Sequence, residues 1–131
     1  MTDVLGFDNV FVEVGDLDDA LVFYRDLIGL PIHRHFGELG MVLFRVGDER
    51  PGLGVRAVGE PRAGGQKLWF EVPDACAMAE RLTANGVALL APPVQIPTGW
   101  VVEVADPWGN VLGFTDYCGH PDLARPEAGR A

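Results

Sequence analysis

Two stretches of this chain repeat one pattern, and the repeat limits the possible folds more than any other feature. Residues 9–27 read NVFVEVGDLDDALVFYRDL and residues 64–82 read GGQKLWFEVPDACAMAERL. Each stretch has a strand-like apolar run, then an acidic turn, then apolar residues at helical spacing. Asp16 and Asp74 stand where an N-cap favours the start of a helix. We therefore predict two copies of one strand–helix unit.

The second halves of the two copies match as well. LFRVGD at 43–48 aligns with VVEVAD at 101–106 at the same spacing as the first halves. After one inserted residue, GLGV at 52–55 aligns with VLGF at 111–114. Each copy therefore predicts the order strand, helix, strand, strand, strand, which is an α+β fold.

The breaks in the repeat predict how the chain is divided. The first module runs from about 7 to 58 and the second from about 65 to 117. The stretch 59–65 is rich in Gly and Pro, as expected of a linker. The tail 118–131 has little to pack against, so we expect it to be frayed. At 131 residues, the two modules are expected to share one domain.

Charge and composition exclude several classes of function. The net charge of −9 repels phosphate backbones, which argues against a nucleic-acid partner. No apolar run reaches the roughly 20 residues that span a bilayer, and the N-terminus MTDVLGFD lacks the features of a secretory signal. Cys76 and Cys118 are too few for a disulfide framework and are expected to be reduced. These features predict a cytoplasmic protein without a membrane partner.

Three motifs resemble one known family. Asp106–Asn110 (DPWGN) is similar to its DPxGN turn, and Phe70–Asp74 and Phe23–Pro31 (FYRDLIGLP) are similar to its other local motifs. The family is the vicinal oxygen chelate superfamily, also called the glyoxalase / bleomycin resistance / dioxygenase family. The resemblance implies two tandem βαβββ modules that form an open, cleft-containing mixed barrel. It also implies a small-molecule ligand in the cleft and a homodimer.

The positions that hold a metal in that family carry unsuitable residues here. The resemblance places metal ligands at Asn9, Gly54, Lys67 and Gly113, where the family has His, Gln or Glu. Metal cations bind imidazole, carboxylate or thiolate groups, whereas glycine has no side chain and lysine is itself cationic. We therefore predict no metal site and no cofactor.

Two alternatives stay open at this point. His33 and His35 lie two residues apart on a predicted strand, so both could face one side and hold a metal. A register shift of one residue would instead turn Gln66 toward the cleft in place of Lys67. That shift would turn Val10 and Val12 toward the cleft and bury the carboxylate of Glu13, which is costly.

Strand alternation predicts which side chains line the cleft. The predicted ligand-binding residues are Asn9, Phe11, Glu13, Leu43, Arg45, Gly54, Arg56, Lys67, Trp69, Glu71, Val101, Glu103, Gly113 and Thr115. Phe11 and Trp69 suit a flat ring or a cation. Gly54 and Gly113 leave room for a ligand, or else mark strand curvature. Glu71 and Glu103 are candidate general bases, unless they pair with nearby Arg and Lys residues.

Three functions are consistent with this predicted site. The first is a metal-free protein that sequesters a hydrophobic, aromatic or cationic small molecule, as the family's drug-resistance proteins do. The second is a lyase, isomerase or dioxygenase of the same superfamily, using a cleft Glu as base or, less in keeping with the residues, a metal. The third is an interaction subunit with a vestigial cleft. Cys76 is not expected to be a nucleophile, because nearby Asp74 raises the pKa of a thiol.

Overall fold

Each half of the chain forms a four-stranded mixed sheet with a helix packed on one face. The computed structural model describes residues 3–5 and 7–126. The chain divides into two compact units, Met1–Gly64 and Gly65–Ala131, and each is described by itself. Residues 127–131 of the predicted tail lie outside the described residues.

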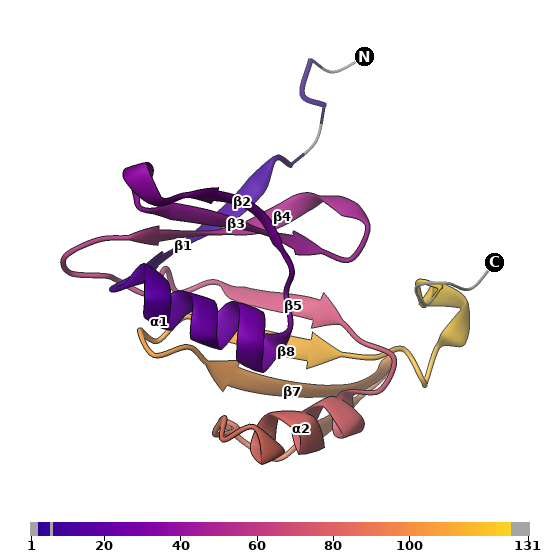
Figure 1. Ribbon diagram of the computed structural model, residues 1–131. Coiled ribbons are helices and arrows are strands. Elements are labelled where there is room, and N and C mark those ends of the chain that lie inside the picture. Colours follow the sequence, from indigo (N-terminus) through magenta and orange to yellow (C-terminus); the bar gives the residue numbers. More distant parts are fainter. Residues whose placement is uncertain (1–2, 6, 127–131) are drawn as a thin grey trace. The chain divides into compact units, whose positions relative to one another are not determined.

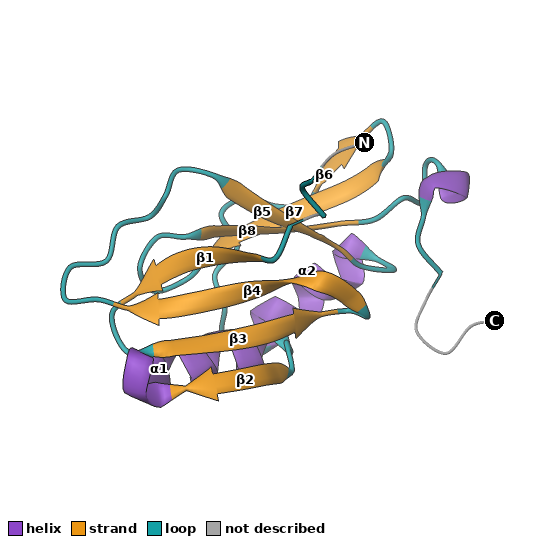
Figure 2. Ribbon diagram, turned by 90° about the horizontal axis from the view of Figure 1, so that it is seen from above, coloured by secondary structure: helices purple, strands orange, loops and turns teal. Residues whose placement is uncertain are grey.

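The first unit has the predicted order of elements (Figure 1). Its elements are β1 (Asn9–Val14), α1 (Leu17–Leu21), the π-helix η1 (Val22–Ile28), β2 (Ile32–Phe36), the 3-10 turn η2 (Gly37–Leu39), β3 (Met41–Val46) and β4 (Glu49–Ala57). The strands are ordered β1-β4-β3-β2, as Figure 2 shows. Strand β1 is parallel to β4, and the other neighbours are antiparallel.

The second unit repeats this topology, which confirms the prediction from the sequence repeat. Its elements are β5 (Lys67–Glu71), α2 (Ala75–Ala84), β6 (Val94–Ile96), β7 (Gly99–Ala105), β8 (Val111–Thr115) and the 3-10 turn η3 (Pro121–Leu123). The strands are ordered β5-β8-β7-β6, and β5 is parallel to β8. Helix α2 packs on β7 and β8 (Figure 1).

Both helices begin at the predicted aspartates. The side chain of Asp16 accepts a hydrogen bond from the N–H of Asp19 at 2.9 Å, and Asp74 accepts one from Ala77 at 3.0 Å. Each bond satisfies an N–H that has no partner within the helix. The first helix ends at Gly29, whose φ of 95° is a left-handed conformation that glycine adopts without strain. The sequence did not indicate that its last seven residues, Val22–Ile28, are π-helical.

Alternating side chains bury one face of each sheet against its helix. In the first unit these include Val12, Val14, Val42, Phe44, Leu53 and Val55; in the second they include Val102, Val104, Leu112 and Phe114. The buried ring of Tyr24 lies 5.7 Å from that of Phe44, measured between centroids. The side chains at the intervening positions point to the opposite face of each sheet. By strand alternation, the predicted site residues of β1, β4, β5, β7 and β8 fall on these opposite faces, where Val101 and Thr115 are nevertheless buried.

Candidate functional site

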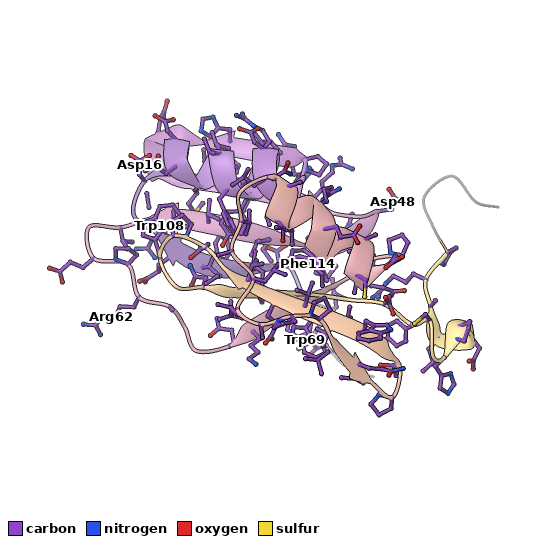
Figure 3. All side chains as sticks on the ribbon, turned by 90° about the horizontal axis from the view of Figure 1, so that it is seen from below. Asp16, Asp48, Arg62, Trp69, Trp108 and Phe114 are labelled. Atoms are coloured by element: carbon purple, nitrogen blue, oxygen red, sulfur yellow. The ribbon has the colours of Figure 1, made fainter. Side chains whose placement is uncertain are left out.

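Three strands of the second unit place one row of predicted site residues side by side. Trp69 of β5 pairs with Gly113 of β8, and Gly113 pairs with Glu103 of β7. Paired residues point to the same face, so Trp69 and Glu103 flank a glycine that has no side chain. Figure 3 shows Trp69 and Phe114 on opposite sides of this sheet, because Phe114 occupies the alternate, helix-covered face.

The indole ring of Trp69 lies over Gly113. A Cβ atom added at Gly113 would stand 2.4 Å from Cδ1 and 2.6 Å from Nε1 of Trp69. Both distances are far below van der Waals contact, so the ring takes the space of the missing side chain. The sequence suggested that Gly113 leaves room for a ligand; in the structure the indole fills this room. Trp69 as a whole residue stays 48% exposed and offers an aromatic surface.

A carboxylate fixes the orientation of this ring. Nε1 of Trp69 donates a hydrogen bond to Oε2 of Glu103 at 3.0 Å, and Nζ of Lys67 donates to Oε1 of Glu103 at 3.2 Å. Each oxygen of Glu103 therefore accepts a hydrogen bond, and the pairing with Lys67 that the sequence left open is present. The side chain of Glu103 is 23% exposed and that of Lys67 is 58% exposed. The cluster presents an aromatic ring beside a hydrogen-bonded, paired carboxylate.

The first unit carries a similar pair of residues. Phe11 pairs with Gly54, and a Cβ at Gly54 would meet Cδ1 and Cε1 of Phe11 at 2.5 Å. Phe11 is 45% exposed, much as Trp69 is. Leu43 of β3 pairs with Gly54, just as Glu103 of β7 pairs with Gly113 in the second unit. The alignment of the two repeats matched Arg45 with Glu103. The strand pairing shows that this part of the alignment was shifted by two residues.

The other predicted residues of the first unit lie near this pair. Asn9 pairs with Gly52, and Glu13 pairs with Arg56 along β1 and β4. The carboxylate of Glu13 accepts a hydrogen bond from the backbone N–H of Arg62 at 2.9 Å. Arg45 lies where the register of β3 and β4 shifts.

Glu71 lies two residues after Trp69 on β5 of the second unit. It pairs with Thr115 of β8, which pairs with Val101 of β7. The Glu71 carboxylate accepts two hydrogen bonds from Arg125 in the tail, one from the backbone N–H at 2.8 Å and one from Nη1 at 2.7 Å. Arg125 was not predicted as a site residue, because no periodic pattern covers the tail. The tail was expected to be frayed, but these bonds hold Arg125 against the second unit.

The side chains at the expected metal positions do not suit a metal ion. The ammonium of Lys67 is paired with Glu103, and Gly113 cannot carry a donor side chain beneath the indole of Trp69. Within residues 3–5 and 7–126, no three His, Cys, Asp or Glu side chains gather as they would around a metal ion. His33 and His35 are exposed on β2, where the register shifts between Ile32 and Arg34.

The strand pairing follows the predicted register rather than the shifted one. Val12 and Val14 are buried on the helix-covered face, whereas the shifted register would have turned Val12 away from it. Gln66 lies just before the first residue of β5. Lys67 and Trp69 therefore share the face that Gly113 occupies.

Two buried aspartates build the framework of the second unit rather than its open face. Asp106 in the DPWGN turn accepts hydrogen bonds from the N–H groups of Trp108 and Asn110 at 2.9 Å. Asp116 accepts hydrogen bonds from the N–H groups of Ala75 at 2.8 Å and Trp100 at 3.0 Å. Burial tends to raise the pKa of Asp116, but these N–H donors and those of Cys118 lower it overall.

The thiols have properties opposite to those of a catalytic nucleophile. Burial raises the pKa of Cys76, and Asp74 adds to the rise, as the sequence predicts. A hydrogen bond to Asp116 raises the pKa of Cys118. Both shifts favour the protonated thiol over the thiolate. None of the described helices is long and apolar enough to cross a membrane.

Comparisons with known proteins agree with this fold. The family model of the Glyoxalase/Bleomycin resistance protein/Dioxygenase superfamily matches residues 2–114. A lactoylglutathione lyase from Agrobacterium tumefaciens is similar in structure, with 22% identity, a TM-score of 0.70, and 88% of this chain and 96% of that chain covered. UcmS2 has 25% identity and a TM-score of 0.73, with 86% and 98% covered. A superfamily member from Sphaerobacter thermophilus has 19% identity and a TM-score of 0.73, with 88% and 99% covered. A search of curated proteins found no significant match.

Proposed function

This chain belongs to the glyoxalase/bleomycin resistance protein/dioxygenase superfamily, and we propose that it is a metal-free protein that binds a flat aromatic or cationic small molecule. The observation that carries the proposal is the indole of Trp69, which lies on Gly113, is hydrogen-bonded to Glu103 and remains 48% exposed. A ring held in one orientation loses little conformational entropy when a ligand stacks on it.

The chemistry of the neighbouring groups supports the choice of ligand. The face of an indole attracts cations as well as other aromatic rings. Glu103 at the edge of this ring is paired with Lys67, but the whole chain carries a net charge of −9. The indole face and the net charge favour a ligand that is positively charged over one that is negatively charged.

The same contacts favour binding over catalysis. Each oxygen of Glu103 accepts a hydrogen bond from Lys67 or Trp69. A general base needs an oxygen aimed at a substrate proton, whereas these oxygens are aimed at protein donors. The residues at the family's metal positions also do not suit a metal, so the metal-dependent chemistry of the superfamily has no support in the chain's own side chains.

Isothermal titration with a small set of flat cations and neutral rings of the same shape tests this proposal. We expect binding that weakens about five- to 150-fold in Trp69→Ala, since an aromatic stacking contact is worth about 1–3 kcal/mol. Trp108→Ala is the matched control, because Trp108 lies in the DPWGN turn and not in the Trp69 row. Unchanged binding by Trp69→Ala would exclude this ring as the site. Turnover of a ligand that stops in Glu103→Gln would favour the enzyme alternative.

A further inference from the structure

The tail of the second unit returns to the sheet after β8. Gly119 donates its N–H to the carbonyl of Thr98 at 3.0 Å, and η3 then turns the chain. Arg125 follows and binds Glu71 through its backbone N–H and its guanidinium. Figure 1 shows the end of β5 and the tail on the same side of the second unit. The tail thus brings a cationic group to one of the predicted ligand-binding residues.

The two partners in this contact differ in exposure. The side chain of Glu71 is 13% exposed, whereas that of Arg125 is 61% exposed. A carboxylate that is largely withdrawn from water needs hydrogen-bond donors and a compensating charge. The exposed guanidinium supplies them, but another cation could supply them as well. Because Arg125 loses little burial on leaving, it is the replaceable member of the pair.

The position of Glu71 relates this contact to the aromatic surface. Trp69 and Glu71 are alternate residues of one strand, so their side chains emerge on the same face about 7 Å apart. That spacing fits a molecule that has a flat ring at one end and a cationic group at the other. The ring would lie on Trp69, and the cationic group would reach Glu71.

We propose that Glu71 is the subsite for the cationic group of the ligand, and that Arg125 occupies this subsite when no ligand is bound. This inference rests on the proposed binding function and adds the class of ligand, which is a flat ring that bears an amidinium, guanidinium or ammonium group. The ligand displaces Arg125 from Glu71, so the tail competes with the ligand. Removing the guanidinium therefore strengthens binding.

The test compares benzamidine, a flat ring with an amidinium group, with benzamide, its neutral counterpart of nearly the same shape. Dissociation constants are measured for the wild type, Arg125→Gln and the matched control Arg25→Gln. Arg25 also forms an exposed ion pair, with Asp26 in the first unit, so both variants remove one positive charge. We expect Arg125→Gln to bind benzamidine about two- to fivefold more tightly, since an ion pair with an exposed partner contributes modestly. Benzamide binding is expected to be unchanged in both variants.

The outcomes separate the two proposals. If the wild type binds benzamidine and Arg125→Gln binds it equally or more weakly, competition by the tail is overturned. The proposed function then stands. Absence of benzamidine and benzamide binding in the wild type and in Arg125→Gln overturns both proposals. A gain of the same size in Arg25→Gln shows a general charge effect and also overturns competition by the tail.

Hydrogen exchange gives a second readout. The N–H of Arg125 donates to Glu71, so benzamidine is expected to accelerate its exchange with solvent. In Glu71→Gln, benzamidine is expected to lose its preference over benzamide. Exchange at Arg125 that does not respond to saturating benzamidine contradicts displacement of the tail.

Discussion

Replacing Gly113 with alanine is expected to displace the indole of Trp69. The new Cβ would stand 2.4 Å from Cδ1 of the ring, so the ring must move by about 1 Å or more to regain van der Waals contact. The hydrogen bond from Nε1 to Glu103 is 3.0 Å long and would stretch beyond its useful range. A backbone clash is not expected, because Gly113 does not have a positive φ.

The size of the effect follows from the contacts that are lost. A hydrogen bond to a charged acceptor at this half-exposed site contributes about 1 kcal/mol, and the ring's contact with the strand contributes about 1 kcal/mol more. Alanine is favoured over glycine in a strand by about 0.5–1 kcal/mol, which offsets part of the loss. The expected net destabilisation is therefore about 1–1.5 kcal/mol, or roughly 3–8 °C in melting temperature.

A double-mutant cycle isolates this interaction. Unfolding free energies are measured by urea titration for the wild type, Gly113→Ala, Trp69→Ala and the double variant. Without the indole, Gly113→Ala is expected to be neutral or slightly stabilising, because nothing then occupies the space over the glycine. The matched cycle uses Phe11 and Gly54 in the first unit, where the ring carbons would stand 2.5 Å from the new Cβ. A cost for Gly113→Ala that is just as large without Trp69 would show that contact with the indole is not its cause.

Further changes test other parts of the account. Glu103→Gln is expected to weaken binding of a flat cation about three- to tenfold and to leave a neutral ring of the same shape unaffected, as measured by calorimetry. Asp116→Ala is expected to cost about 2–4 kcal/mol in urea unfolding at neutral pH, because it leaves buried N–H groups without an acceptor. Because the pKa of Asp116 is lowered in the folded state, its carboxylate stabilises the fold above the unfolded pKa of about 4. This contribution is lost as the pH falls through the lowered pKa of the folded state. In that pH range the wild type should lose stability more steeply than the variant. Asp106→Ala is expected to cost a similar amount, because it removes the acceptor for two N–H groups of the DPWGN turn.

The fold could be predicted because its signals are local and periodic. Alternation in residues 9–14 and 67–71 sets which face of each strand is buried, and Asp16 and Asp74 mark the helix starts. The repeat then fixes the order of elements in both units. The π-helix of Val22–Ile28 was not predicted, because its apolar spacing resembles that of an ordinary helix.

The candidate site was predicted less completely, because its contacts join residues that are distant in the sequence. Alternation placed Trp69, Glu103 and Gly113 on one face, but it could not show that the indole covers the glycine. The contact between Glu71 and Arg125 depends on the path of a tail without periodicity. The shift in register near Arg45 also escaped prediction, since a bulge changes cross-strand partners without changing the local pattern.

The central claim is that the Trp69 surface binds a flat cation without a metal ion. The most direct measurement is the dissociation constant of such a ligand for protein that has been treated with chelator and checked by elemental analysis. We predict that the chelated protein binds it, and that adding zinc, nickel, iron or manganese leaves the dissociation constant unchanged. About one ion per chain in the untreated protein, with binding lost on chelation and restored by that ion, would contradict the account.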